Sequence, residues 1–428
     1  MPLSDHVDSY YSRTRSDVLT RAALHGKAET ETCVIGGGLA GIATALGLAE
    51  RGHSVVALEA NRLGWGASGR NGGFLSAGFA LGAQELEARI GLDSAQELYE
   101  MSSDAVDLIR QRAEIYGIDC GGFPAGGVNN SWFADTNRVK AGIGYMNQRF
   151  GTNLEYWSRE KVRETYLSPR YHDAVFNPHV FQLHSMNYAN GCAIAAEGMG
   201  AIFHEQSPVT EIKKQADRHC VKTASGDVIA DNVVFCCSGH IGWLKQRLSW
   251  ATLPIGTYVL LTEELGARLK TAIIPPFAAS DNRRIDNYYR PLPDTRLLWG
   301  GGMSISRRPA NLEAQMLEDL FSVYPQLRGI RAEIAWAGTM GYARHRMPQI
   351  GQLGPGIWYN QGHGGHGLNT TTLGGELVAR AIAESDRSYK ILAPFGLDFA
   401  GGPVGLLAAH LVYWCWKTRD FWDARRSP

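Results

Sequence analysis

Two histidines and four glycines crowd the stretch 361-QGHGGHGLNTT-371. His363 and His366 are three residues apart, a spacing that suits two metal ligands on one face of a helix. Glycine at this density disfavours a helix and instead suits backbone that approaches a ligand closely. The stretch alone is therefore compatible with a metal site, a phosphate loop or a cofactor-contacting loop. No third ligand is suggested nearby, so we expect no metal.

Residues 32–60 carry the pattern of a complete βαβ unit, TCVIGGGLAGIATALGLAERGHSVVALEA. A short apolar strand leads into a GxGxxG motif, an alanine-rich helix follows, and a second apolar strand ends at Glu59. The motif and its first helical residues supply the candidate cofactor contacts Gly36, Gly38, Leu39, Ala40 and Gly41. A strand before the motif and a helix after it make the signal far more specific than GxGxxG alone.

Each position in this unit has a physical reason. Gly36 permits the tight turn, Gly38 lets backbone approach a pyrophosphate, and Gly41 lets the helix pack closely on the strand. The start of the helix offers free N–H groups and a positive dipole end to phosphates. Glu59 lies 18 residues after Gly41 and is placed to accept hydrogen bonds from the adenosine ribose. An acid here disfavours a 2′-phosphate, so FAD or NAD is favoured over NADP.

The segment that follows, 63-LGWGASGRNGG-73, favours FAD. NAD enzymes usually continue into another βα unit, whereas one type of flavoprotein runs a loop of small residues along the pyrophosphate toward the flavin. Side-chain donors would come from Ser68, Arg70 and Asn71. The candidate contacts of this segment are Ala60, Arg62, Gly66, Ala67, Ser68, Arg70, Asn71, Gly72 and Gly73.

These two motifs together resemble the D-amino acid oxidase (DAO) family of FAD-dependent oxidoreductases, and within it the γ-glutamylputrescine oxidase branch most closely. Further similar stretches occur in the expected order along nearly the whole chain. They are SYYSRTR (9–15), SPVTEI (207–212), NVVFCCSGH (232–240), YYR (288–290), LLWGGG (297–302), RMPQIGQL (346–353) and YNQGHGGHGLNTTTLGGELVA (359–379). Cys237 and Ser238 stand where the family usually has Ala-Thr.

The resemblance implies an α/β fold: a Rossmann-like FAD/NAD(P)-binding domain with an inserted antiparallel-sheet substrate domain. The expected segments are 28–85, 150–240 and 335–390 for the FAD domain, 86–149 and 242–334 for the substrate domain, and 391–428 for an apolar, amphipathic C-terminal tail. In this family layout, the antiparallel sheet covers the flavin.

The implied activity is oxidation of an amine at its C–N bond by noncovalently bound FAD. Hydride would pass to flavin N5, the imine would hydrolyse, and O2 would reoxidise the flavin to give H2O2. The leading small-molecule substrate is a γ-glutamylated polyamine such as γ-glutamylputrescine, or a related amine. Alternatives are a cyclic or N-alkyl amino acid (L-pipecolate, proline or sarcosine), a membrane-docked amine dehydrogenase that reduces a quinone, and a non-catalytic flavin-binding subunit.

The resemblance also turns the opening stretch into the last flavin-contacting loop. Asn369 is the expected N-cap of a helix at 370–385, whose N-terminus would stabilise negative charge at the flavin's N1 and C2=O edge. The remaining candidate FAD contacts are Val209, Ser238, Gly239, Gly338, Gly364, Gly365, His366, Gly367, Leu368, Asn369 and Thr370.

The candidate substrate-facing residues are Tyr258, Met340, His345 and His363. Tyr258 falls where the family places a residue over the flavin face, although an aromatic in a sheet core would look the same. Amino-acid oxidases of the family hold the substrate carboxylate with an arginine near this point, and counting back from Pro348 puts Met340 there. This departure disfavours a free α-amino acid, unless Arg344 or Arg346 substitutes.

Composition bounds the setting. The formal net charge is +0, which gives no reason to expect nucleic acid as a partner. The 7 cysteines contain no CxxC pair, which suits a reducing, cytoplasmic compartment. The N-terminus lacks an apolar signal region. We therefore expect a cytoplasmic enzyme.

The chain also lacks an apolar run of about 20 residues, so no membrane-spanning helix is expected. The apolar run at 404–416 is expected to be a helix docked on the protein itself. A peripheral membrane contact through 404–426 is the alternative, with Lys417, Arg419, Arg425 and Arg426 facing lipid headgroups.

Overall fold

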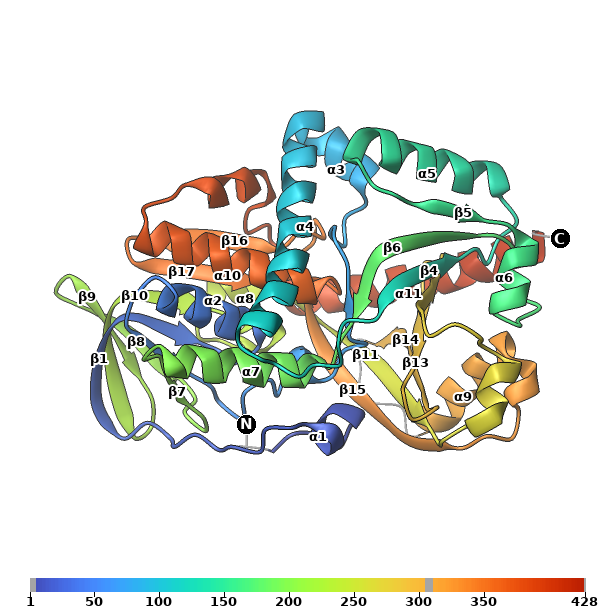
Figure 1. The fold of residues 1–428 in the computed structure, drawn as a ribbon. Helices are drawn as coiled ribbons and strands as arrows, with labels where there is room; N and C mark the ends of the chain where they lie inside the picture. Colours follow the sequence, from blue (N-terminus) through green and yellow to red (C-terminus); the bar gives the residue numbers. More distant parts are fainter. Residues whose placement is uncertain (1–4, 305–310, 427–428) are drawn as a thin grey trace.

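Two β-sheets organise the chain in the computed structural model, which describes residues 5–304 and 311–426. The first sheet has 8 strands with the main order β16-β17-β10-β1-β2-β7, and β8 and β9 extend it beside β10 (Figure 1). Its strands are β1 (Gly26–Ile35), β2 (Val55–Leu58), β7 (Ile202–His204), β8 (Glu211–Gln215), β9 (Arg218–Lys222), β10 (Gly226–Phe235), β16 (Gln349–Gly354) and β17 (Ile357–Gln361).

The centre of this sheet is parallel, because β2, β1, β10 and β17 run in the same direction. Parallel strands are buried on both faces, and all four residues of β2 are buried accordingly. Helices α2 (Leu39–Ala49), α4 (Leu92–Ile115), α7 (Ser185–Gly198) and α10 (Gly367–Ala383) pack together beside it. A Cβ on Gly375 of α10 would lie 2.7 Å from the backbone of Ala43, so small residues set the approach of α10 to α2.

The second sheet has 9 strands in the order β15-β11-β14-β13-β12-β4-β6-β3, with β5 paired to β6. Its pairs are antiparallel except β4 with β12. The strands are β3 (Phe74–Leu75), β4 (Ala125–Asn130), β5 (Glu155–Trp157), β6 (Ala174–Gln182), β11 (Leu253–Thr262), β12 (Ala278–Asp281), β13 (Asn287–Pro291), β14 (Leu297–Ser304) and β15 (Ala332–Tyr342). Stacked rings of Tyr289 and Trp299, 4.6 Å apart, anchor the core beneath it.

The remaining helices surround these layers (Figure 1). They are α1 (Tyr10–Thr14), α3 (Ala83–Ile90), α5 (Thr136–Phe150), α6 (Arg159–Thr165), α8 (Gln246–Trp250), α9 (Leu312–Val323) and α11 (Gly402–Arg426). Within the described ranges, no helix has both the length and the apolar character that crossing a membrane requires.

The expected fold class is confirmed: a Rossmann-like parallel unit is joined to a largely antiparallel second sheet. The domain boundaries stay a prediction, and several placements differ from it. Strands β3, β5 and β6 and most of β15 come from segments expected in the FAD domain but pair in the second sheet. Helix α4 comes from the segment expected in the substrate domain but packs on α10 and α7.

Candidate functional site

A cavity of about 950 Å³ is lined by residues of both sheets, a volume at the upper end of ordinary small-molecule sites. One end lies at the β1–α2 turn and the carboxyl end of β2. The walls continue along the 65–74 loop and the start of α10 to strands β12–β15. Segments far apart in the sequence therefore meet around one space.

At the β1–α2 turn the three glycines have different environments. Gly36 has φ +109°, and a Cβ there would lie 2.8 Å from the carbonyl oxygen of Cys236. A Cβ on Gly41 would lie 1.8 Å from the carbonyl oxygen of Gly36, so Gly41 serves helix–strand packing and does not line the cavity. A Cβ on Gly38 would meet only Ser68 Oγ at 3.0 Å. Gly38 is thus the glycine that leaves the cavity open.

Glu59 ends β2 and lines the same end of the cavity with Ala60. Its Oε2 accepts from the Gly37 N–H at 2.6 Å and its Oε1 from the Asn61 N–H at 2.8 Å. Burial raises the pKa of Glu59, and these backbone donors oppose that rise. The two N–H groups hold the carboxylate in place beside the turn.

The 63–73 loop is tied to the turn and crosses to the second sheet. Ser68 Oγ accepts from the Leu39 N–H at 2.8 Å, at the start of α2. Arg70 donates to the carbonyls of Trp65 and Ala337, and its guanidinium lies 4.3 Å from the centroid of the Trp65 ring. Its Nη2 is buried and has no partner within the described residues, and burial lowers the pKa of Arg70 to about 10. One buried donor therefore remains available to a ligand.

The glycine loop before α10 is held in left-handed conformations, with φ +71° at Gly362, +55° at Gly364 and +88° at Gly365. Tyr342 packs against it, because a Cβ on Gly365 would lie 2.8 Å from Tyr342 Oη. His366 is the N-cap and α10 begins at Gly367.

The prediction that Asn369 caps this helix is wrong. Asn369 lies in the first turn of α10 and donates to the Gly78 carbonyl at 3.0 Å. Its amide thus holds the neighbouring 76–80 loop, and the helix begins earlier, at Gly367, directly after the left-handed glycines.

His363 is buried on this loop. Its Nδ1 lies 3.1 Å from Thr370 Oγ1, and its Nε2 has no partner within the described residues. Burial lowers the pKa of His363 to about 4, so the ring is neutral at physiological pH. Among the described residues, no cluster of three or more His, Cys, Asp or Glu side chains could hold a metal ion.

Most of the sequence-predicted residues meet at the cavity. Its wall includes Gly36, Gly38, Leu39, Ala40, Glu59, Ala60, Gly66, Ala67, Ser68, Arg70, Asn71, Gly72, Gly73, Val209, Ser238, Gly338, Met340, His363, Gly364, Gly365, His366, Gly367, Leu368 and Asn369. The described residues outside the wall are Gly41, Arg62, Gly239, Tyr258, His345 and Thr370. Tyr258 packs in the core beneath the second sheet.

His345 has a structural environment. Its Nε2 lies 3.0 Å from the Gly396 carbonyl, and its Nδ1 accepts from the Met347 N–H at 3.1 Å. The contact with Gly396 ties the turn between β15 and β16 to the segment after α10.

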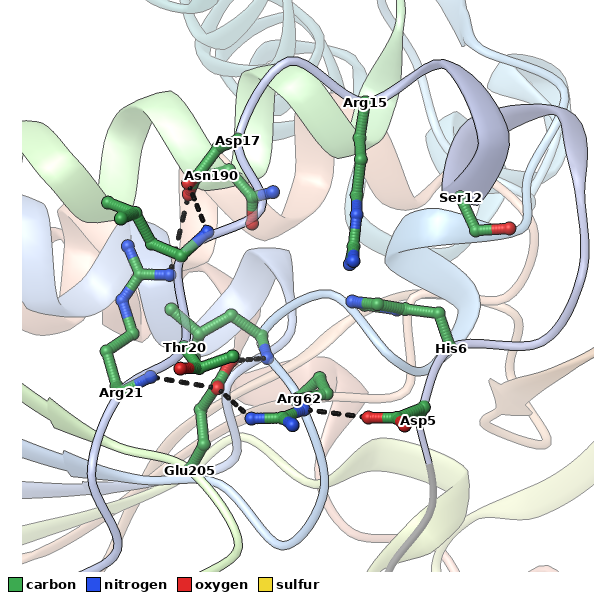
Figure 2. Close-up of a pocket in the computed structure, with 12 residues that line it drawn as sticks. Asp5, His6, Ser12, Arg15, Asp17, Thr20, Arg21, Arg62, Asn190 and Glu205 are labelled. Carbon is green, nitrogen blue, oxygen red and sulfur yellow. Dashed lines mark hydrogen bonds and ion pairs between the residues drawn. The ribbon is translucent and has the colours of Figure 1, made fainter.

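Arg62 faces a second cavity of about 360 Å³ beneath the N-terminal segment (Figure 2). Its guanidinium pairs with Asp5 at 3.0 Å and with Glu205 at 2.9 Å. Glu205 also accepts from the Arg21 N–H at 3.1 Å. Arg62 thus fastens the N-terminal segment over the 59–66 loop.

Sequence reasoning missed part of the cavity wall. Asp286, Tyr288 and His240 line it. Tyr288 looks like an ordinary sheet aromatic, and Asp286 lies in 281-DNRRIDNYYR-290, a charged stretch typical of a solvated turn. No local sequence signal distinguishes Asp286, which lines the cavity, from the other charged residues of this stretch.

The comparisons with known proteins agree with this geometry. Residues 31–381 match the DAO family, FAD dependent oxidoreductase. The chain is 34% identical to the gamma-glutamylputrescine oxidoreductase of Escherichia coli K12, over 89% of this chain and 90% of that protein. It is 31% identical to a probable oxidoreductase OrdL of Haemophilus influenzae, over 90% of each.

Solved structures share the fold. Glycine oxidase from Geobacillus kaustophilus superposes with a TM-score of 0.71 at 21% identity, covering 87% of this chain and 99% of that one. The family resemblance inferred from the motifs is thereby confirmed, and FAD is the cofactor. The chain belongs to the DAO family of FAD-dependent oxidoreductases.

Proposed function

We propose that this enzyme oxidises an amine at the C–N bond, and that the substrate is a γ-glutamylated polyamine such as γ-glutamylputrescine. The observation that carries the proposal is that the cavity wall near Met340 offers no arginine for a substrate carboxylate. Of the described residues that line the cavity, Arg70 alone is an arginine. Arg344 is exposed outside the cavity wall, and Arg346 pairs with Glu85. Neither is set up to hold the carboxylate of a free α-amino acid, so L-pipecolate, proline and sarcosine are the weaker candidates.

The residues present fit FAD at three points. Gly38 leaves the approach to the start of α2 open, as a pyrophosphate requires. Glu59 is a carboxylate fixed at the end of β2, where a ribose would lie. The Nη2 of Arg70 and the N-terminal N–H groups of α10 offer hydrogen-bond donors without partners among the described residues, in the rest of the cavity wall. We propose that these residues hold FAD noncovalently.

Bound FAD supplies the acceptor for the hydride that leaves the amine carbon. The protein's part is to bind and orient. The N-terminal N–H groups of α10 favour negative charge beside them. His363 is neutral and presents an unpaired Nε2 next to this helix start, where it can donate or accept one hydrogen bond. Met340 and Tyr342 supply a polarisable and an aromatic surface for an alkyl chain.

A peripheral membrane contact is the second proposal, and α11 supports it. Its exposed apolar side chains include Val404, Leu407, Leu411, Trp414 and Trp422, each more than half exposed. A contiguous face of this kind marks a site of interaction. Helix α11 is 25 residues long and passes behind β4 and β6 in the view of Figure 1.

The charges of α11 favour an anionic bilayer over a second copy of the chain. Asp420 is buried, Asp423 is partly exposed, and both pair with Arg284. The fully exposed charged residues of α11 whose side chains the structure describes, Lys417, Arg419 and Arg425, are all cationic. A symmetric dimer would set this cationic face against itself, whereas acidic headgroups would complement it.

Sedimentation with vesicles tests the contact. We expect the holoenzyme to bind phosphatidylglycerol vesicles and to release them at high salt, with Leu407→Glu/Leu411→Glu abolishing binding. The matched control is Val18→Glu/Ile115→Glu, since these side chains are equally exposed elsewhere. If the wild type does not bind these vesicles, the membrane contact is excluded. If the wild type is a dimer and Leu407→Glu/Leu411→Glu is a monomer, the apolar face of α11 contacts a second copy of the chain instead.

We propose O2 as the electron acceptor and the cytoplasm as the compartment. The described cysteines are unpaired thiols, five of them buried, as in a reducing setting.

A peroxide-coupled screen tests the function with γ-glutamylputrescine, putrescine, pipecolate, sarcosine, proline and D-amino acids in parallel. The proposal predicts peroxide with γ-glutamylputrescine at the highest kcat/KM. Preference for an amino acid would overturn the substrate, and dye reduction without peroxide would favour a quinone-linked dehydrogenase.

A further inference from the structure

Carboxylates are scarce in the wall of the large cavity. Of the described residues that line it, only Glu59, Arg70 and Asp286 carry a carboxylate or a guanidinium. Glu59 is held by the backbone N–H groups of Gly37 and Asn61 at the β2 end. Asp286 belongs to the β12–β13 turn of the other sheet, beside Tyr288 and Tyr342. The cavity thus has a second carboxylate, on the wall formed by the second sheet.

The arginines around this turn are already paired, and Asp286 is not among their partners. Arg283 binds Asp281 through two bonds of 3.0 and 2.8 Å, and lies 3.9 Å from the centroid of the Trp132 ring. Arg284 binds Asp420 at 2.7 Å. The carboxylate of Asp286 makes no hydrogen bond or ion pair with another side chain of the described residues.

The loop that carries Asp286 is fixed from outside. Asp420 Oδ2 on α11 accepts from the Arg284 N–H at 3.0 Å and from the Ile285 N–H at 3.2 Å. On the other side, Asp281 accepts from the Asn287 N–H at 3.3 Å. These contacts hold the turn on both flanks, so Asp286 is presented to the cavity by a positioned backbone rather than by a free loop.

The electrostatics suit a cationic ligand. Surrounding protein and the nearby Asp281 carboxylate raise the pKa of Asp286 to about 7. Asp420 adds to this rise and Arg283 opposes it, while the neighbouring Tyr288 and Tyr342 phenols stay neutral because burial raises their pKa. A positive group placed beside Asp286 would relieve the repulsion between acids and favour the ionised form.

We propose that Asp286 determines specificity by binding a second ammonium group of the substrate, one that is not the reacting nitrogen. The reacting amine must be neutral to lose hydride, and a carboxylate beside it would keep it protonated. The preferred substrate class is therefore an amine with a further cationic nitrogen, such as a diamine or an amino-acid conjugate of one. This inference rests on the proposed amine oxidation.

Paired substrates test the assignment with the FAD-loaded enzyme at pH 8, above the pKa of Asp286. Putrescine carries the second ammonium group that n-butylamine of equal chain length lacks. We expect Asp286→Asn to lower the preference for putrescine over n-butylamine in kcat/KM by about 10- to 100-fold, chiefly through KM. Oxidation of n-butylamine should be unchanged, and the spectral titration of the oxidised flavin should show the same loss of diamine affinity.

Asp423→Asn is the matched control, because it removes one negative charge near Arg284 but lies on α11 outside the cavity wall. It should leave the substrate preference unchanged. An unchanged preference in Asp286→Asn, with normal FAD content and Tm, would overturn the inference and leave amine oxidation intact. If the wild type oxidises and binds neither these two amines nor γ-glutamylputrescine, the proposed function fails and the inference fails with it.

Discussion

Alanine at two glycines of one motif should affect two different properties: Gly41→Ala the stability of the fold, and Gly38→Ala the binding of FAD. A Cβ on Gly41 would lie 1.8 Å from the Gly36 carbonyl oxygen, whereas real Cβ atoms essentially never come closer than 3.0 Å. Turn and helix must therefore separate by about 1.2 Å. Because α2 is buried along its whole length, we expect Gly41→Ala to destabilise the apoprotein by about 1–3 kcal/mol.

Gly38→Ala should spare the fold. Its backbone is extended, at φ −82° and ψ 179°, and its Cβ would meet only Ser68 Oγ at 3.0 Å. The apoprotein should keep its stability within about 0.5 kcal/mol. The added methyl group would instead occupy the approach of the pyrophosphate, which we expect to raise the Kd for FAD by about 5- to 150-fold.

Urea unfolding of the apoproteins and fluorescence titration with FAD measure the two effects separately. Gly198→Ala at the end of α7 is the control, since nothing lies within 4 Å of its Cβ: the Kd for FAD should not change, and the free energy of unfolding should rise by no more than about 1 kcal/mol. The proposed separation of packing and FAD contact is wrong if Gly38→Ala unfolds as readily as Gly41→Ala, or if Gly38→Ala binds FAD with the wild-type Kd.

Three further variants test other contacts of the site and the fold. Glu59→Gln replaces a carboxylate that accepts two N–H bonds, so FAD should bind more weakly in a reconstitution titration while the reduction potential of bound flavin stays the same. Arg112→Met leaves Glu50 and Glu376 without their buried partner, and urea unfolding should show a loss toward the lower end of about 3–5 kcal/mol. The pKa of His363 is lowered to about 4 from 6.5, so stability falls as pH drops from about 6.5 to 4, and in His363→Gln the Tm should fall less over this range.

The parts of the site that were predictable rest on local chemistry. Gly36, Gly38 and Glu59 belong to one continuous βαβ unit, in which turn, helix start and strand end lie within about 30 residues. Their placement needs no long-range register. The 63–73 loop is likewise continuous with that unit, and its small residues line the cavity as expected.

The parts that failed depend on contacts between distant segments. Asn369 was predicted to be the N-cap, but its side-chain amide donates a hydrogen bond to the carbonyl of Gly78, about 290 positions away in the chain. Asp286 reaches the cavity because β13 pairs with β12 and β14 and because α11 fixes the preceding turn. Tyr258 reads equally well as a cavity or a core residue, since alternation in a strand does not reveal which face a ligand occupies.

Anaerobic reduction of the bound flavin tests directly whether this enzyme oxidises a γ-glutamylated amine. We expect γ-glutamylputrescine to bleach the visible absorbance of the FAD-loaded enzyme, and O2 to restore it with one H2O2 formed per substrate oxidised. The proposed function is contradicted if the enzyme holds stoichiometric FAD and is bleached by neither γ-glutamylputrescine nor putrescine, while a free α-amino acid bleaches it.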